Sequence, residues 1–222
     1  MTTKNNTTNT NWVDVTVPLR NGMVVWPGDI KVEIIRRVSM DRGDICNNSS
    51  INMGVHTGTH MDAPLHFIAK GKSIDQLPID VTVGHARVIE IKDKVSIKPE
   101  ELKQYNIKRG ERIIFKTFNS PRCWEIDKFA DDFVYITKSA AQFLVDAGVK
   151  LVGVDYLSVG SPFDPEDGMK DVHDILLGAE TWLIEGMNLE AVIAGNNNLI
   201  CLPLKLINTE GSPVRVILQP IK

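Results

Sequence analysis

The stretch TKSAAQFLVDAGVKLVGVD, residues 137–155, indicates the class of fold. Its first half predicts a helix, because Thr137 is a favoured N-cap residue and the apolar side chains that follow share one helical face. Gly148 predicts the end of that helix. The apolar segment 150–160 comes next and predicts a buried strand. A helix that leads directly into a buried strand is typical of an α/β chain whose sheet is partly parallel.

Other segments extend this α/β pattern on both sides. Helices are predicted over residues 171–180 and from Pro99, because proline suits the first turn of a helix. Alternating or apolar segments predict strands at residues 13–19, 31–40, 50–56, 86–93, 111–118, 181–189, 199–207 and 213–221. We therefore expect one α/β domain over residues 12–222, which is long enough for a sizeable core.

The composition argues against two classes of partner. The chain has 222 residues, of which 43% are apolar, and a formal net charge of −3. It has no basic stripe, so we expect no nucleic-acid partner. No apolar run approaches the ~18 residues that a membrane span needs, so we expect no membrane partner.

The N-terminus and the cysteines bear on location. Residues 1–11 are polar, which predicts a disordered arm and not a signal peptide. Cys46, Cys123 and Cys201 are odd in number and far apart, which suits neither a disulfide framework nor a zinc motif. Reduced thiols in a cytoplasmic protein are the expectation.

Residues 56–66, HTGTHMDAPLH, hold three of the chain's five histidines. His56 and His60 have the spacing of two metal ligands on one helical face. However, the Thr-Gly-Thr segment between them disfavours a helix, and Pro64 restricts the residue before it to extended conformations. We therefore expect an irregular loop after a strand, in which the glycine permits a tight bend.

The same run offers a ligand set for a divalent ion. Two imidazoles and the carboxylate of Asp62 suit Zn²⁺, Mn²⁺ or a related metal, which lowers the pKa of its water to ~7. His66 is then available for proton transfer. The alternative is that these histidines are ordinary surface or core residues. His85 is expected to be such a residue, whereas His173, in an apolar segment, is left open between the two.

The histidine run resembles the signature of the cyclase-like metal-dependent hydrolases, a family that includes bacterial kynurenine formamidase (arylformamidase) and isatin hydrolase. Four further segments resemble that family in the same order along the chain. They are GMVVWPGD (22–29), LVGVDYLSV (151–159), HDILLGAETWLIEGMNL (173–189) and LPLKLINTEGSPVRVIL (202–218). The resemblance implies one domain with a mixed, barrel-like β-sheet and flanking helices, of swivelling β/β/α type. It also implies a homodimer or homotetramer.

The resemblance further implies five metal ligands, namely His56, His60, Asp62, His173 and Glu185. The first three would hold one ion. The carboxylate of Asp62 would bridge to a second ion, which the last two complete. Glu180 lies closer to His173 in sequence but does not match the family position. One or two divalent ions, Zn²⁺ or Mn²⁺, are therefore expected as cofactors.

Two other residues acquire roles from the resemblance. His66 matches the family's proton-transfer histidine. Trp26 matches a tryptophan that contacts an aromatic substrate, although it could instead fill the core or a subunit interface. The acidic segment 158–173 departs from the pattern of kynurenine formamidase. It is either a solvated loop or a cover over the pocket, and the second possibility would put the substrate in doubt.

The implied reaction is hydrolysis of a C–N bond in a small amide or formamide, with His66 moving the proton. N-formylkynurenine is the leading substrate, and a cyclic amide such as isatin is next. Two other classes stay open. A lyase or cyclase would use the same metal to acidify a C–H bond, and a catalytically silent, metal-stabilised binding module would not need His66.

Overall fold

The computed structural model describes residues 11–164 and 168–221. The N-terminal segment that is predicted to be disordered, residues 1–11, lies outside this part of the chain except for Asn11. The middle of the acidic segment, residues 165–167, also lies outside it. Within the described ranges, no helix is both long enough and apolar enough to cross a membrane.

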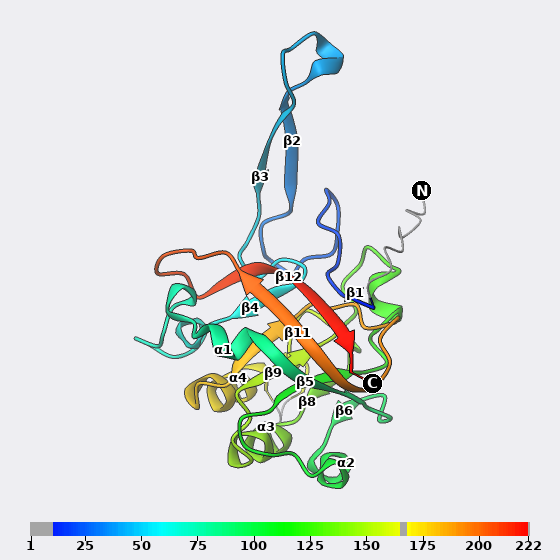
Figure 1. Ribbon diagram of the computed structural model, residues 1–222, viewed down its shortest axis with the longest axis vertical. Coiled ribbons are helices and arrows are strands. Elements are labelled where there is room, and N and C mark those ends of the chain that lie inside the picture. Colours follow the sequence, from blue (N-terminus) through cyan, green and yellow to red (C-terminus); the bar gives the residue numbers. More distant parts are fainter. Residues whose placement is uncertain (1–10, 165–167, 222) are drawn as a thin grey trace.

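A mixed β-sheet that closes on itself forms the centre of the molecule (Figure 1). Its strands are β1 (Val13–Asp14), β4 (His60–Asp62), β5 (Val83–Glu90), β7 (Arg112–Lys116), β9 (Leu151–Val154), β10 (Trp182–Glu185), β11 (Gly195–Pro203) and β12 (Gly211–Pro220). Their order is β1-β12-β11-β5-β7-β9-β10-β4, and a further pairing of β12 with β4 closes a ring. β5, β7, β9 and β10 are mutually parallel, and the other pairs are antiparallel. The predicted α/β fold with a mixed, barrel-like sheet is confirmed.

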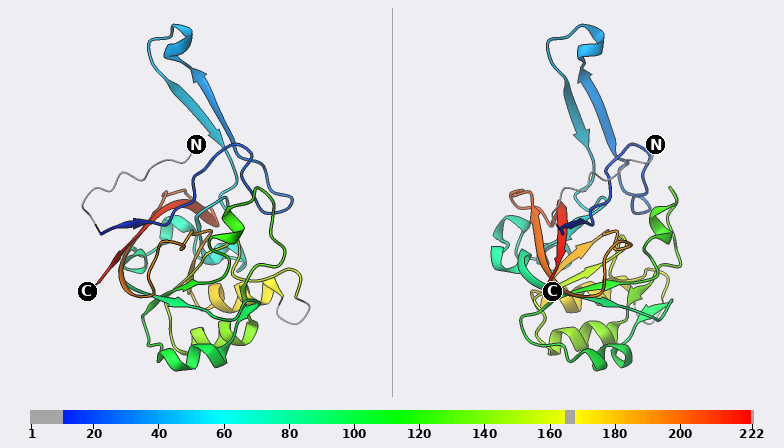
Figure 2. Two further views of the ribbon diagram at one scale, coloured as in Figure 1. Left: turned by 90° about the vertical axis from the view of Figure 1, so that its right-hand side faces the viewer. Right: turned by 45° about the vertical axis from the view of Figure 1, so that its right-hand side comes forward.

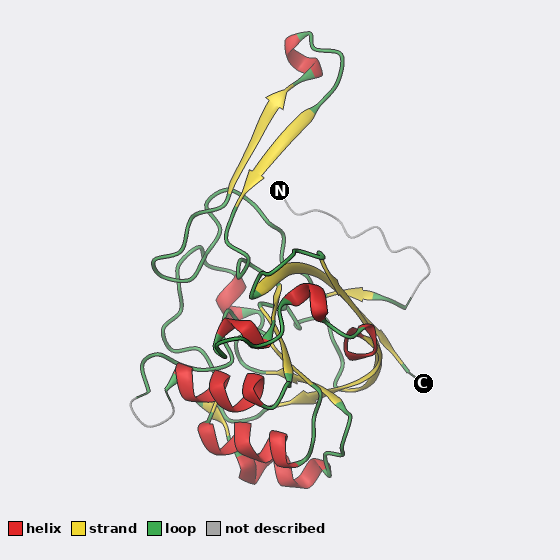
Figure 3. Ribbon diagram, turned by 90° about the vertical axis from the view of Figure 1, so that its left-hand side faces the viewer, coloured by secondary structure: helices red, strands yellow, loops and turns green. Residues whose placement is uncertain are grey.

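Two helices, α3 (Lys138–Asp146) and α4 (Met169–Gly178), lie together beside this ring (Figure 3). α3 begins where the sequence predicts, because the Thr137 hydroxyl accepts the N–H of Ala140 at 3.1 Å. The shorter elements are α1 (Ile79–Thr82), α2 (Pro99–Leu102), the paired strands β6 (Ser96–Ile97) and β8 (Tyr135–Ile136), and the 3₁₀ turns η1 (Met40–Arg42), η2 (Pro64–His66), η3 (Ile74–Gln76), η4 (Lys103–Tyr105) and η5 (Arg122–Trp124).

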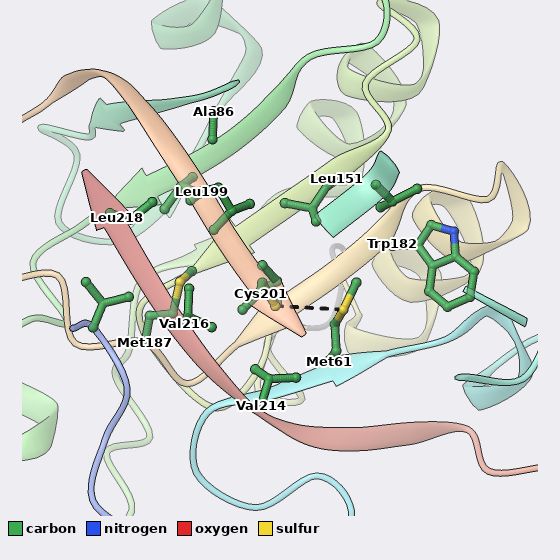
Figure 4. Packing of buried hydrophobic residues seen from close by; sticks show 14 of the residues in the cluster. Met61, Ala86, Leu151, Trp182, Met187, Leu199, Cys201, Val214, Val216 and Leu218 are labelled. Atoms are coloured by element: carbon green, nitrogen blue, oxygen red, sulfur yellow. Dashed lines mark hydrogen bonds between the residues drawn. The ribbon is translucent and has the colours of Figure 1, made fainter. Parts of the chain in front are cut away.

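Alternate side chains of the central strands pack into two apolar clusters, because successive residues of a strand face opposite ways. Ile114 of β7 and Leu151 of β9 belong to the cluster enclosed by the ring, which Figure 4 shows. Their neighbours Ile113 and Val152 belong to the second cluster, with Leu144 of α3 and other residues of α3 and α4. The parallel strands are therefore buried on both faces, as their continuous apolar sequences predict.

A long β-hairpin projects from the body of the molecule (Figures 1 and 2). Its strands, β2 (Glu33–Val38) and β3 (Asn48–Asn52), pair with each other and with no other described strand. The chain enters this hairpin a few residues after Asp29 and leaves it a few residues before His56. The hairpin is called the arm below.

The histidine run is more regular than the sequence predicts. Residues 60–62 form β4, which pairs with both β10 and β12, and Pro64–His66 form η2. Only the Thr-Gly-Thr segment is a bend, where Gly58 has a φ of 63°. The expectation of an irregular loop is therefore wrong for residues 60–62, because pairing with strands distant in sequence decides their conformation.

Candidate metal centre

β4 and β10 bring three buried polar side chains together. The antiparallel register places His60 opposite Glu185, and the alternation of the strand puts His60 and Asp62 on the same face. All three side chains are at least 97% buried. The Nε2 atom of His60 lies 3.5 Å from Asp62 Oδ1 and 3.3 Å from Glu185 Oε2. Two carboxylates and an imidazole thus converge in the protein interior.

α4 adds a second imidazole to the cluster, that of His173. His173 Nε2 lies 3.4 Å from Glu185 Oε1 and 3.7 Å from Asp62 Oδ2. Glu185 is itself held in place, since its Oε1 accepts the N–H of Val159 at 2.7 Å. The residues that the sequence associates from two distant segments therefore occupy one site.

The hydrogen bonds of both rings orient Nε2 toward the carboxylates. His60 Nδ1 lies 2.9 Å from the carbonyl oxygen of Gly58, and His173 Nδ1 lies 2.7 Å from that of Met169. A carbonyl oxygen can only accept, so each Nδ1 donates a proton and, in the neutral ring, Nε2 carries a lone pair. A lone pair and a carboxylate oxygen repel each other unless a proton or a cation lies between them. This arrangement is typical of histidines that bind metals.

His56 and His66 also lie beside Asp62. His56 Nδ1 is 2.8 Å from Asp62 Oδ1, and the His56 ring stacks on that of His66 with centroids 3.9 Å apart. In His56, Asp62 and His66, one possible ligand atom of each residue lies within 4.8 Å of the other two. The same is true of His60, Asp62 and Glu185. Asp62 belongs to both groups, which places its carboxylate where two ions could share it.

Contacts with histidines lower the pKa values of both carboxylates in the cluster. Burial acts to raise the pKa of Asp62, but the charge of His56 and its hydrogen bond outweigh burial and hold that pKa far below its usual range. Burial and the charge of Asp62 both act to raise the pKa of Glu185, but contacts with His173 and His60 outweigh them and lower it. Both carboxylates are therefore ionised at neutral pH, which favours a bound cation.

The pKa values of the two flanking histidines move in opposite directions. Burial acts to lower the pKa of His56, but the charge of Asp62 reverses this and raises it. Burial also lowers the pKa of His66, and the neighbouring charges of His56 and His173 add to the effect although Asp62 opposes it. His66 is therefore a neutral imidazole at neutral pH, in the form that accepts a proton.

Two buried atoms of the cluster have no hydrogen-bond partner, namely Asp62 Oδ2 and His56 Nε2. Buried polar atoms without a partner are rare in native proteins, and a bound cation would satisfy both of these atoms. Imidazole nitrogens and carboxylate oxygens are the donors that Zn²⁺ and Mn²⁺ prefer. The residues present therefore fit one or two divalent ions.

Every predicted site residue except Asp62 lines one pocket, and Asp62 is buried in contact with His56 of that lining. Trp26 lines that pocket and its ring meets Phe129 edge-on, with centroids 5.1 Å apart. His66 lies closer to the ligand groups than the sequence implies. His85 and Glu180, which the sequence does not predict to be ligands, are both exposed and do not line the pocket. Glu180 pairs with Lys72 at 2.6 Å.

The sequence reading missed several residues that line the pocket. They are Asp29, Phe67, Leu157, Ser158 and Met169. Two signals could have found some of them: Asp29 closes the turn that contains Trp26, and residues 157–158 follow the carboxyl end of parallel strand β9, where ligands often bind. Glu210 was also missed, although its Oε1 lies 3.6 Å from His56 Nε2.

The molecule combines a closed mixed barrel with a buried cluster of imidazoles and carboxylates beside a pocket. These features define a metal-dependent enzyme of the hydrolase type. The chain belongs to the family described as "Putative cyclase", whose model matches residues 13–161. The resemblance inferred from the histidine run and the four other segments is thereby confirmed.

The relatives agree with this assignment. The chain is 34% identical to a kynurenine formamidase of Bacillus cereus and 36% identical to that of Bacillus cytotoxicus, in both cases over 95% of this chain and 98% of the relative. A solved structure described as a "predicted metal-dependent hydrolase" from Bacillus stearothermophilus superimposes with a TM-score of 0.79 at 30% identity, over 93% of this chain and 97% of the other. Isatin hydrolase A from Labrenzia aggregata shares the fold, with a TM-score of 0.79 at 24% identity over 93% and 92% of the two chains.

Proposed function

We propose that this chain is a metal-dependent hydrolase that cleaves the C–N bond of a small aryl formamide similar to N-formylkynurenine. The observation that carries this proposal is the buried cluster in which Asp62 belongs to two ligand groups and keeps one oxygen without a hydrogen-bond partner. The similarity to kynurenine formamidases along 95% of the chain supports the substrate class.

The ligands of the proposed centre come from three segments of the chain, namely the histidine run, α4 and β10. His56, His60 and Asp62 would hold one divalent ion, and Asp62 with His173 and Glu185 would hold a second. When bound, such an ion polarises a carbonyl oxygen and lowers the pKa of a coordinated water to ~7. We propose Zn²⁺ or Mn²⁺, because the donor set mixes imidazole nitrogen with carboxylate oxygen.

His66 is the proposed acid–base residue. Its neutral imidazole accepts the proton of the attacking water, and the resulting imidazolium returns it to the leaving nitrogen. The ring is positioned for this by stacking on His56 and by an edge-on contact with Phe67 at a centroid distance of 4.5 Å. Because His66 also lies within ligand distance of His56 and Asp62, its own role as a ligand is the alternative that mutagenesis must exclude.

The aromatic walls of the pocket favour an aryl group in the substrate. Trp26 and Phe67 line it together with the apolar side chains of Leu157 and Met169. Flat rings stack on such walls, with a gain of ~0.5–1.5 kcal/mol beyond the burial of apolar area. A cyclic aryl amide such as isatin fits the same walls and breaks the same type of bond, so it is the second candidate.

The arm supports a proposal about assembly. A two-stranded hairpin is only marginally stable by itself, and this arm exposes the apolar side chains of Met40, Ile45 and Ile51. We propose that a second copy of the chain covers it in a homodimer or homotetramer. Light scattering should therefore report more than one chain per particle, and Ile45→Lys should shift the population toward the monomer; a monomeric native protein would contradict the proposal.

The three cysteines support a cytoplasmic location, since all are free thiols, with Cys46 exposed.

The experiment for the proposed activity is turnover of a panel of formanilides, lactams and lactones by metal-loaded protein, followed by mass spectrometry. We expect an aryl formamide to yield the arylamine and formate, with the mass of one water added. A product with unchanged total mass would indicate a lyase or cyclase, and no turnover of any member would contradict the hydrolase assignment.

A further inference from the structure

We propose that Asp29 and Trp26 form a subsite for a primary ammonium group on the substrate, and that Asp29 determines specificity for it. This inference rests on the proposed function, and it assigns to that site a residue that determines specificity for substrates with an ammonium group. It is argued from the turn that holds the two residues, from the charges that line the pocket, and from the chemistry of an indole beside a carboxylate.

The Trp26-Pro27-Gly28-Asp29 turn holds its two end residues at the pocket. The N–H of Asp29 donates to the carbonyl oxygen of Trp26 at 3.0 Å, and Gly28 has a φ of 96°. Proline at the second position and a positive φ at the third are typical of a type II turn, in which the first and fourth residues lie close together. Both Trp26 and Asp29 line the same pocket as the histidine cluster. The turn therefore presents an indole and a carboxylate side by side.

The carboxylate of Asp29 is free to bind a ligand. Among the described residues, two carboxylates line the pocket, and Glu185 is committed to His60, His173 and the N–H of Val159. Asp29 is exposed, and its carboxylate makes no hydrogen bond or ion pair with the described part of the chain. A substrate that enters the pocket therefore meets one uncommitted negative charge.

The described lining of the pocket contains no lysine or arginine. A carboxylate on the substrate thus has no cationic side chain to bind there, whereas an ammonium group has Asp29. For a substrate that carries both groups on one carbon, the ammonium should point to the turn and the carboxylate to solvent. Removal of the substrate's carboxylate should consequently change kcat/KM little, whereas neutralisation of its ammonium group should lower kcat/KM more.

Trp26 adds a second attraction for the same group. An ammonium near the face of an indole is drawn to the negative charge of the ring, and tryptophan is the best aromatic residue for such contacts. A carboxylate beside an indole therefore favours a cationic group over a neutral one. The same indole can still contact the aryl ring, because that ring lies between the formamide and the side chain.

The test uses full-length, metal-loaded protein and three formanilides with the same ortho side chain. The first carries an amino-acid group, the second a primary amine without the carboxylate, and the third the same amine capped by an acetyl group. The variants are Asp29→Asn, which keeps the size of the side chain and suits the turn, and Asp131→Asn, a matched control at an exposed aspartate that does not line this pocket. The value of kcat/KM is measured for every combination of protein and substrate at two ionic strengths.

We expect Asp29→Asn to lower kcat/KM for the two ammonium substrates by about 5- to 30-fold, mainly through KM, which is the range for losing one charged hydrogen bond at a partly exposed site. The acetylated substrate should change by less than about twofold. Added salt should weaken the preference of the wild type for ammonium, since the pair is screened. Asp131→Asn should match the wild type throughout.

A binding measurement separates this inference from the proposed reaction. Calorimetric titration with the deformylated amine and its acetylated counterpart needs no turnover, and Asp29→Asn should weaken only the first. Equal affinity of wild type and Asp29→Asn for the ammonium ligand would overturn the subsite, whether or not formamides are hydrolysed. Absence of formamide turnover together with retained, Asp29-dependent ammonium binding would instead overturn the reaction and leave the subsite standing.

Discussion

Replacement of Gly211 by alanine tests the position of the His56 ring without touching a proposed ligand. Gly211 lies on β12 opposite Asp62 in the strand register. A methyl group at Gly211 would lie 2.7 Å from His56 Cε1 and 2.9 Å from the carbonyl oxygen of Met61. The glycine has an ordinary backbone conformation, so the substitution acts through steric overlap and not through backbone strain. We expect the methyl group to displace the His56 ring from Asp62.

The size of the effect follows from two costs. Forcing a methyl group into a close-packed site costs ~1–3 kcal/mol of folding free energy. In a protein of this size each kcal/mol lowers the melting temperature by roughly 2–4 °C, so the metal-free protein should melt about 2–12 °C lower. Disturbing the orientation of a metal ligand typically costs 10- to 100-fold in metal affinity, and we expect Gly211→Ala to fall in that range.

The assay is competition with a chromophoric chelator for affinity, combined with thermal melting of the metal-free protein. Gly178→Ala is the matched control, because a methyl group there would lie 3.6 Å from Ile68 Cδ1, an ordinary contact, and Gly178 ends helix α4. That control should leave metal affinity unchanged and stabilise slightly. A destabilised Gly211→Ala protein with unaltered metal affinity would refute the assignment of His56 as a ligand.

Replacements within the site separate ligands from their neighbours. His66→Ala should lower kcat by roughly 10²- to 10⁴-fold with metal content retained, whereas loss of metal would make His66 a ligand. Glu185→Gln should reduce metal binding, while Glu180→Gln, on the exposed pair with Lys72, should not. Trp26→Ala should raise KM for an aryl formamide several-fold and leave an aliphatic amide and the melting temperature nearly unchanged; a loss of ~3–5 kcal/mol would identify it as a core residue. A chelator should lower the melting temperature, and an unchanged value would argue against a metal-stabilised fold.

The elements that the sequence predicts well are those with local causes. α3 begins after the Thr137 cap and ends before Gly148 because both signals lie within the segment itself. β7 and β9 are buried strands because their apolar residues run without interruption. His56, His60 and Asp62 could be proposed as ligands from the histidine run itself. His173 and Glu185 could be named only because several segments resemble one family, since nothing local links them to that run.

What the sequence could not predict depends on pairing between distant segments. β4 is three residues long and exists because β10 and β12 flank it. The arm consists of two segments that each look like ordinary strands, and only the structure shows that they leave the barrel together. The stacking of His66 on His56 likewise follows from the fold of η2, which no spacing rule anticipates.

The number of metal ions per chain tests the central claim most directly. Elemental analysis after loading and desalting should give one or two equivalents of a divalent ion for the wild type. Asp62→Asn, which keeps the volume of the side chain, should lose all of them because both ligand groups contain Asp62. A wild-type protein that holds no ion, or an Asp62→Asn protein that keeps the full complement, would contradict a metal centre built on this carboxylate.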